Sequence, residues 1–170
     1  ETALGDGGGI YNNGTIDAMY SSSSNSTSTV YNYIEIYRNT ASMGHGGGIY
    51  NNNIINVVFE SNHTNYYTTY NYFYTNQNYA SMGDGGGIYN AGTIDIDYND
   101  QNSTSNYYAY NYFYVNSNRA DMSNGGGIYN TDTGTIDVDF NNSNDLSNNY
   151  DYNYFQVDSN TANIDGGGIY

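Results

Sequence analysis

The chain has 170 residues and a formal net charge of -15, because 17 acidic side chains are opposed by only two basic ones. It contains 24 Tyr and 21 Gly but no Pro, Cys or Trp. The lack of a basic cluster argues against nucleic acid and anionic membranes as partners. The absence of Cys rules out a disulfide scaffold and zinc–thiolate sites. Apolar runs of only a few residues predict no membrane insertion.

A glycine-rich pentapeptide organises the whole chain. The sequence GGGIY begins at Gly7, Gly46, Gly85, Gly125 and Gly166, at intervals of 39, 39, 40 and 41 residues. A period of this length is typical of a solenoid or an array. We therefore expect a single repetitive segment over 1–170, with units at about 7–45, 46–84, 85–124 and 125–165 and the start of a further unit. A phosphate-binding loop is excluded, since neither a Lys nor a helical pattern follows any triplet.

Each unit carries three apolar segments, of which the first is GGGIY itself. The second alternates strictly: in TIDIDY, Ile94, Ile96 and Tyr98 share one face and Asp95 and Asp97 the other. This pattern predicts a half-buried strand. Its apolar partners in the other units are Ile16, Ala18 and Tyr20; Ile55, Val57 and Phe59; and Ile136, Val138 and Phe140.

The third segment is YAYNYFYVN, residues 108–116, and it has counterparts in the other units. Phe73, Phe113 and Phe155 align, and we place Ile36 at the same position in the first unit. Three residues later come Asn39, Asn76, Asn116 and Asp158.

No segment shows a helical pattern, and the residues that favour helices are scarce. We predict an all-β fold, a parallel β-solenoid of about four ~40-residue repeats. Tight corners in such a fold select Gly because they require positive φ or leave no space for a Cβ. Asn-rich corners can form side-chain hydrogen-bond ladders between coils. Each unit is either one coil with a long loop between its second and third strands, which we favour, or two shorter coils.

The repeated segments GGGIYNAGTIDID and FYVNSNRA resemble the right-handed β-helix repeats of secreted bacterial adhesins and autotransporter passengers, above all those of chlamydial polymorphic outer-membrane proteins. The family motifs GGA-Ile/Leu and Phe-x-x-Asn correspond to the five GGGI segments and to Phe73–Asn76 and Phe113–Asn116, with weaker matches at Ile36–Asn39 and Phe155–Asp158. The resemblance spans essentially the whole chain and implies a right-handed β-helix. It implies little about function, because that fold carries adhesins, lyases and fibres alike.

An Asn-x-Ser/Thr sequon occurs in the segment between the second and third strands of every unit. These sequons begin at Asn25, Asn62, Asn102 and Asn141, and a fifth, out of register, begins at Asn13. Their recurrence predicts a row of N-glycans that covers one side of the solenoid. The alternative is an unmodified polar loop, because a chain rich in Asn, Ser and Thr generates sequons by chance.

Two outward columns are further candidates for function. Stacked carboxylates at Asp95, Asp97, Asp137 and Asp139, with Asp17 in the first unit, either bind Ca²⁺ or form a solvated face. An aromatic column indicates an interface or a sugar-binding surface, unless the long loop covers it. Its members are Tyr70, Tyr72, Tyr74, Tyr110, Tyr112, Tyr114, Tyr152 and Tyr154. Asp6, Asp84 and Asp165 make another acidic column, which His45 and Asn124 interrupt.

Nothing in the sequence points to catalysis, since His45 and His63 have no counterparts in other units. The chain starts with Glu and begins and ends at nearly the same point of the repeat. We therefore expect a secreted, processed or excerpted chain that belongs to a longer solenoid or stacks end to end. The sequence favours an extracellular structural protein whose partners are further copies of itself and carbohydrate. The alternative is a cell-surface adhesin that binds glycans through its Tyr and Asp faces.

Overall fold

The computed structural model describes residues 1–22, 28–61, 67–100, 107–142 and 150–170. This part of the chain forms seventeen strands and no helix. Every inter-strand pair is parallel and joins a residue to its counterpart one repeat further along, as Tyr50 pairs with Tyr89 and Tyr89 with Tyr129. The predicted all-β parallel solenoid is confirmed. Because neighbouring coils are one full repeat apart, each ~40-residue unit forms a single coil.

Each coil contributes one strand to each of four sheets. Sheet A contains β1 (Thr2–Ala3), β5 (Thr40–Ala41), β9 (Tyr79–Ala80), β13 (Arg119–Ala120) and β17 (Thr161–Ala162). Sheet B contains β2 (Ile10–Asn12), β6 (Ile49–Asn51), β10 (Ile88–Asn90) and β14 (Ile128–Asn130). Sheet C contains β3 (Thr15–Ser22), β7 (Ile54–Ser61), β11 (Thr93–Asp100) and β15 (Thr135–Asn142). Sheet D contains β4 (Ser28–Tyr37), β8 (Tyr67–Asn76), β12 (Tyr107–Asn116) and β16 (Tyr150–Asp158).

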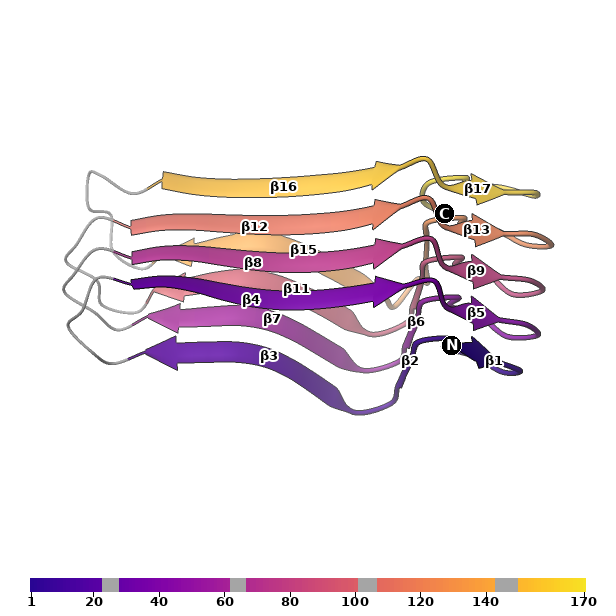
Figure 1. Cartoon of the computed structure of the whole chain (residues 1–170), viewed down its shortest axis with the longest axis horizontal. Helices are drawn as coiled ribbons and strands as arrows, with labels where there is room; N and C mark the ends of the chain where they lie inside the picture. The colour runs from indigo at the N-terminus through magenta and orange to yellow at the C-terminus, as the bar shows by residue number, and fades with distance from the viewer. Residues whose placement is uncertain (23–27, 62–66, 101–106, 143–149) are drawn as a thin grey trace.

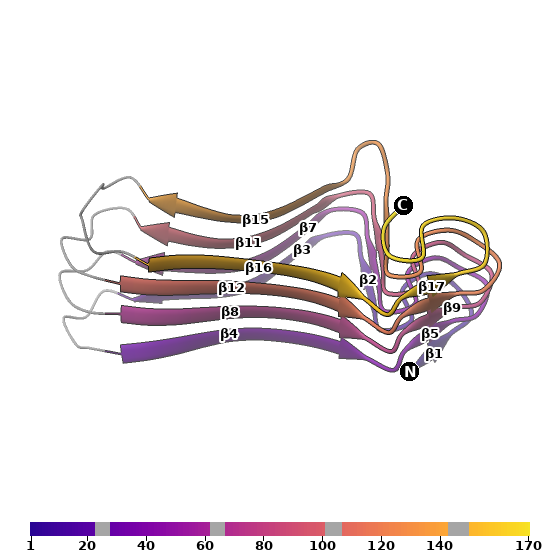
Figure 2. The same ribbon diagram turned by 90° about the horizontal axis from the view of Figure 1, so that it is seen from above.

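The two long sheets, C and D, form the body of the molecule. Figures 1 and 2 show them as two layers that run alongside each other, with the short strands of sheets A and B at one end. In the second and third coils the strands of sheets C and D have eight and ten residues. Most of the segment between them, in which we expected a long loop, lies outside the described residues.

The core lies between sheets C and D. Ile94 and Ile96 of β11 are fully buried against the inward side of sheet D, and Phe73 and Phe113 stack there with ring centroids 5.2 Å apart. The predicted apolar columns are confirmed by the register, in which Ile55, Ile94 and Ile136 are direct partners. Each fully buried Ile or Phe contributes about 1.5–3 kcal/mol, and stacking in register repeats this contribution at every level.

The predicted alignment of the first unit is wrong by two residues. Ile34, not Ile36, pairs with Phe73, and Ile36 pairs with Thr75. Both isoleucines point inward, so an alternating pattern cannot distinguish the two registers. The corner determines the register: Arg38 has a φ of 54° and its counterpart Gln77 has a φ of 57°. Asn39 is thus the counterpart of Asn78 and not of Asn76.

The glycine triplets occupy a corner where backbones of successive coils touch. The first glycine of each triplet has positive φ, as at Gly85 (φ 70°). At the second position the constraint is space, since a Cβ on Gly86 would lie 2.3 Å from the carbonyl carbon of Arg119 and 2.3 Å from the oxygen of Gly126. The predicted glycine stack is confirmed, with two different physical requirements inside one triplet.

Candidate functional site: the tyrosine face

Three ladders of asparagine side chains run along the solenoid. In each one, the amide nitrogen of an Asn donates to Oδ1 of its counterpart in the next coil, over 2.8–3.1 Å. The ladders are Asn12–Asn51–Asn90–Asn130, Asn32–Asn71–Asn111–Asn153 and Asn39–Asn78–Asn118–Asn160. Most members are buried, so each amide depends on its neighbours for hydrogen bonds.

The ladder inside sheet D was missed by the sequence analysis. Asn71 donates to Oδ1 of Asn111 over 2.8 Å and also to the backbone oxygen of Asp97 in sheet C over 2.9 Å. This ladder therefore links successive coils and joins the two long sheets. The triplet Tyr-Asn-Tyr, which recurs at this position in every unit, is the signal that could have revealed it.

The outward side chains of sheet D form a surface that we term the tyrosine face. It consists of Tyr31, Tyr33, Tyr70, Tyr72, Tyr74, Tyr108, Tyr110, Tyr112, Tyr114, Tyr150, Tyr152 and Tyr154. The structure brings together all eight tyrosines that the sequence singled out and adds four more. Within the described residues they alternate with the buried side chains of the same strands, such as Ala109, Asn111 and Phe113.

Between β8 and β12 the rings of the tyrosine face stack on one another along the solenoid axis, whereas several pairs with the first and fourth coils are tilted by 41–56°. Tyr70 and Tyr110 lie 4.8 Å apart, Tyr72 and Tyr112 4.9 Å apart, with interplanar angles of 9° in both pairs. Within one strand, Tyr70 and Tyr72 are also parallel, with centroids 5.9 Å apart. Ring faces in the interior of the array therefore cover each other, and solvent meets ring edges and hydroxyl groups.

The tyrosine face is almost free of charge. Between the levels of Tyr108 and Tyr114, Glu35 is the one charged side chain that the described part of sheet D turns outward. Burial and the neighbouring phenols raise the pKa of Tyr74 to about 12. The pKa values of Tyr72 and Tyr112 are raised for the same reasons. These phenols stay protonated and neutral well above physiological pH.

The opposite layer, sheet C, carries the acidic column. Asp95 pairs directly with Asp137 and Asp97 with Asp139. Burial first, and then the charges of Asp97, Asp137 and Asp139, raise the pKa of Asp95 to about 6. Asp97 is only 6% exposed, so the column is less open than the alternating pattern predicts. Among the described residues, no group of three or more His, Cys, Asp or Glu has the geometry of a metal site. Calcium binding stays a prediction.

The column before the glycine triplets is linked by hydrogen bonds from Asp6 to Asn124, although His45 and Asn124 interrupt its acidic character. Oδ1 of Asp6 accepts from the backbone nitrogen of His45 over 2.7 Å, and Nδ1 of His45 accepts from that of Asp84 over 2.9 Å. Oδ1 of Asp84 accepts a hydrogen bond from the backbone nitrogen of Asn124 over 2.9 Å. Asp6, His45 and Asp84 each accept a hydrogen bond from the next coil, whereas Oδ1 of Asn124 is buried without a hydrogen-bond partner.

Two of the five predicted glycosylation sites, Asn13 and Asn141, belong to the described residues. Asn25, Asn62 and Asn102 lie outside the described residues. Asn141 belongs to β15 and pairs with Asn99, three residues before Asn102, so the sequons do not share one register. The connection between β14 and β15 is two residues longer than that between β10 and β11, which accounts for two of these three residues. Asn13 is exposed, and its Oδ1 accepts from the side chain of Asn52 over 3.0 Å.

A row of exposed apolar side chains follows sheet A and was also missed. Leu4, Met43, Met82, Met122 and Ile164 are each 55–72% exposed and occupy the same bend in successive coils. A Met three residues before three of the five glycine triplets, at Met43, Met82 and Met122, was visible in the sequence. Periodicity alone does not tell an exposed apolar column from a buried one.

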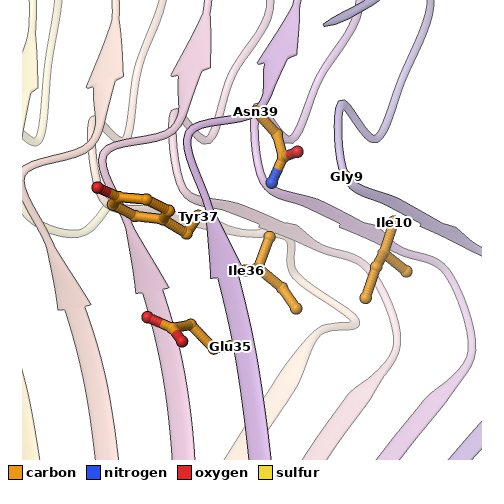
Figure 3. Close-up of a pocket in the computed structure, with 6 residues that line it drawn as sticks. All are labelled: Gly9, Ile10, Glu35, Ile36, Tyr37 and Asn39. Carbon is orange, nitrogen blue, oxygen red and sulfur yellow. The ribbon is translucent and has the colours of Figure 1, made fainter. Parts of the chain in front are cut away.

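Figure 3 shows a hollow of about 390 Å³ lined by Gly9, Ile10, Glu35, Ile36, Tyr37 and Asn39. Its apolar lining consists of core positions of the first coil. The counterpart of Ile10 in the next coil, Ile49, is fully buried. The hollow is therefore the space that a neighbouring coil fills at the other levels, and it offers no constellation of catalytic groups.

Fold and surface together define a parallel β-solenoid with one flat aromatic side and one acidic side. Comparisons with protein-family models, with curated proteins and with solved structures give no significant match for this chain. A search of the described residues finds no helix with the length and apolar character needed to cross a membrane.

Proposed function

We propose that the chain is an extracellular structural protein, a glycosylated β-solenoid that builds a fibre or surface filament by end-to-end stacking of coils. The observation that supports this best is the uniform direction of the three asparagine ladders. In every ladder the amide nitrogen of one coil donates to the next coil in chain order, as Asn12 does to Asn51 and Asn39 to Asn78.

This direction makes the two sides of any coil complementary. One side presents three amide oxygens together with the open edges of its strands, and the other presents three amide donors in the same register. A coil thus has a matching surface for another coil, whether that coil belongs to the same chain or to a second one. Parallel strands at about 4.8 Å spacing extend such a stack without a change of geometry.

The stacked rings favour a structural protein over a glycan-binding adhesin. Binding of a sugar on an aromatic platform needs an open ring face. Tyr70 is covered on both sides, by Tyr31 at 5.0 Å and Tyr110 at 4.8 Å. The tyrosine face offers edges and hydroxyl groups instead.

Cryo-electron microscopy of native, undigested material tests the proposal. We expect long filaments with an axial repeat of about 4.8 Å and extra density at the sequons. Short rods of fixed length, bare at Asn25, Asn62, Asn102 and Asn141, would contradict the structural fibre. The surface adhesin would then be the better explanation.

A further inference from the structure

We propose that the tyrosine face is the interface between two copies of this chain, which pack face to face through sheet D. The inference deepens the proposed function, because it names the partner that joins neighbouring solenoids laterally. It uses a different surface from end-to-end stacking, so each can fail without the other.

The distribution of charge selects sheet D for contact between copies. The chain carries a net charge of -15, and sheet C turns Asp17, Asp95 and Asp137 outward. Two copies that met through sheet C would oppose the like charges carried by its first, third and fourth strands. The tyrosine face has Glu35 as its one outward carboxylate within the described array, and raised pKa values keep Tyr74 and its neighbours neutral. Sheet D is therefore the side on which copies of an acidic rod can approach each other.

The geometry of the array also fits a second copy. Rings repeat every 4.7–4.9 Å from β8 to β12 and every 5.7–6.3 Å along each of these strands. Another copy carries the same two spacings, so rows of one face can fit between rows of the other at the level of β8 and β12. Interdigitation of identical stacked side chains is how paired β-sheets form dry interfaces.

The chemistry of the exposed atoms is self-complementary as well. A phenol hydroxyl both donates and accepts a hydrogen bond, so two rows of phenols can satisfy each other without a third group. Ring edges are partially positive and fit against the phenol oxygens of the opposing copy.

Small-angle X-ray scattering of the purified full chain, at low and at high salt, measures the cross-section of the rods. We expect a two-layer rod, narrow in cross-section, at low salt and a four-layer rod at high salt, because salt screens the repulsion between the acidic copies. End-to-end assembly changes the length of the rods and not their cross-section. Failure of the proposed fibre can therefore be distinguished from failure of the lateral interface. A single cross-section at every salt and protein concentration overturns the interface, and so does tyrosine fluorescence that responds to added oligosaccharides while the rods stay single.

The double variant Tyr72→Thr/Tyr112→Thr removes two central rings while keeping good strand-forming residues. We expect its lateral association to be weaker by about tenfold or more. The matched control, Tyr50→Thr/Tyr89→Thr, removes two stacked rings from sheet B, whose centroids are 4.9 Å apart. Equal weakening in the control overturns the proposal. The wild-type scattering decides the question even if the double variant fails to fold.

Discussion

The side-chain amide of Asn71 donates to Oδ1 of Asn111 over 2.8 Å. With its second hydrogen atom it reaches the backbone of sheet C, at the oxygen of Asp97 over 2.9 Å. Asn111 repeats the arrangement one level further, where it donates to Oδ1 of Asn153 and to the backbone oxygen of Asp139. One polar residue per coil thus holds the long sheets together in the middle of an apolar layer.

Replacement of this residue should be costly. Asn111→Ala removes the acceptor for Asn71 and two donors, and it leaves buried polar atoms without partners. We expect the free energy of unfolding to fall by about 3 kcal/mol, measured by urea denaturation. The control, Asn52→Ala, removes an exposed amide that bonds to Asn13 and should change stability by less than about 0.5 kcal/mol. Similar losses in both variants would show that the buried ladder has no special role.

The glycine corner provides a second test. A methyl group on Gly86 meets backbone atoms of Arg119 and Gly126 at 2.3 Å, which side-chain movement cannot relieve. Gly86→Ala should lower stability by about 3 kcal/mol or more, or prevent folding. Gly14 has negative φ and nothing within 4 Å of an added Cβ. Gly14→Ala should therefore change stability by less than about 1 kcal/mol. Thermal unfolding of the two variants side by side measures the difference, and a tolerant Gly86 would contradict the close backbone contact.

The fold was predictable because its signals repeat. Ile94 and Ile96 alternate with acids, and every unit shows the same alternation, so stacked strands follow from period-two patterning. The glycine triplet marks the corner for a reason that the structure confirms at Gly85 and Gly86. The register of the first unit was missed because the alternation alone was used to align it. Ile34 and Ile36 both point inward, and the alternation does not distinguish them, whereas the Tyr-Asn-Tyr triplets at 31–33 and 70–72 do.

The surface was predictable in part. Tyr112 and Tyr114 had to point outward once Phe113 was placed inward, but the alternation could not show that their rings stack and cover each other's faces. Asn71 was missed because a polar residue at an inward position contradicts binary patterning, and only its partners in adjacent coils make it stable there. Met82 was missed because an apolar residue in a bend looks the same in sequence whether it is buried or exposed.

The acidic side of the solenoid predicts a pH dependence. The pKa of Asp95 is raised to about 6 by burial and by Asp97, Asp137 and Asp139. Between about pH 4 and 6 the folded chain therefore holds a proton that the unfolded chain has lost. Stability from this group is complete at low pH and is lost as the pH rises through 6.

Asp95→Asn should remove the loss of folding stability that the ionisation of Asp95 causes. Because Asp95 is only half-buried, we expect a gain of about 1 kcal/mol at pH 7 and none near pH 4. Urea denaturation at the two pH values measures it. Asp132→Asn, at an exposed turn, removes the same formal charge and serves as the control. A gain at pH 7 that is equal in both variants would mean that net charge alone is responsible.

The tyrosine face predicts a loss of folding stability at alkaline pH. Burial and mutual repulsion raise the pKa values of Tyr72, Tyr112 and Tyr114, and that of Tyr74 to about 12. In the folded chain these phenols keep protons that the unfolded chain loses near pH 10. Their contribution to stability is therefore complete below pH 10 and is lost as the pH rises from about 10 to 12.

Spectrophotometric titration of tyrosinate, in the folded chain and in urea, tests this directly. We expect the folded chain to ionise at higher pH, with unfolding during the last part of the titration. Tyr74→Phe removes the phenol whose pKa is raised to about 12 and keeps its ring in the stack. The end of the titration of the folded chain should therefore move to lower pH. Identical curves for folded and unfolded chains would show that the rings do not form the closely stacked, partly buried array on which the lateral interface depends.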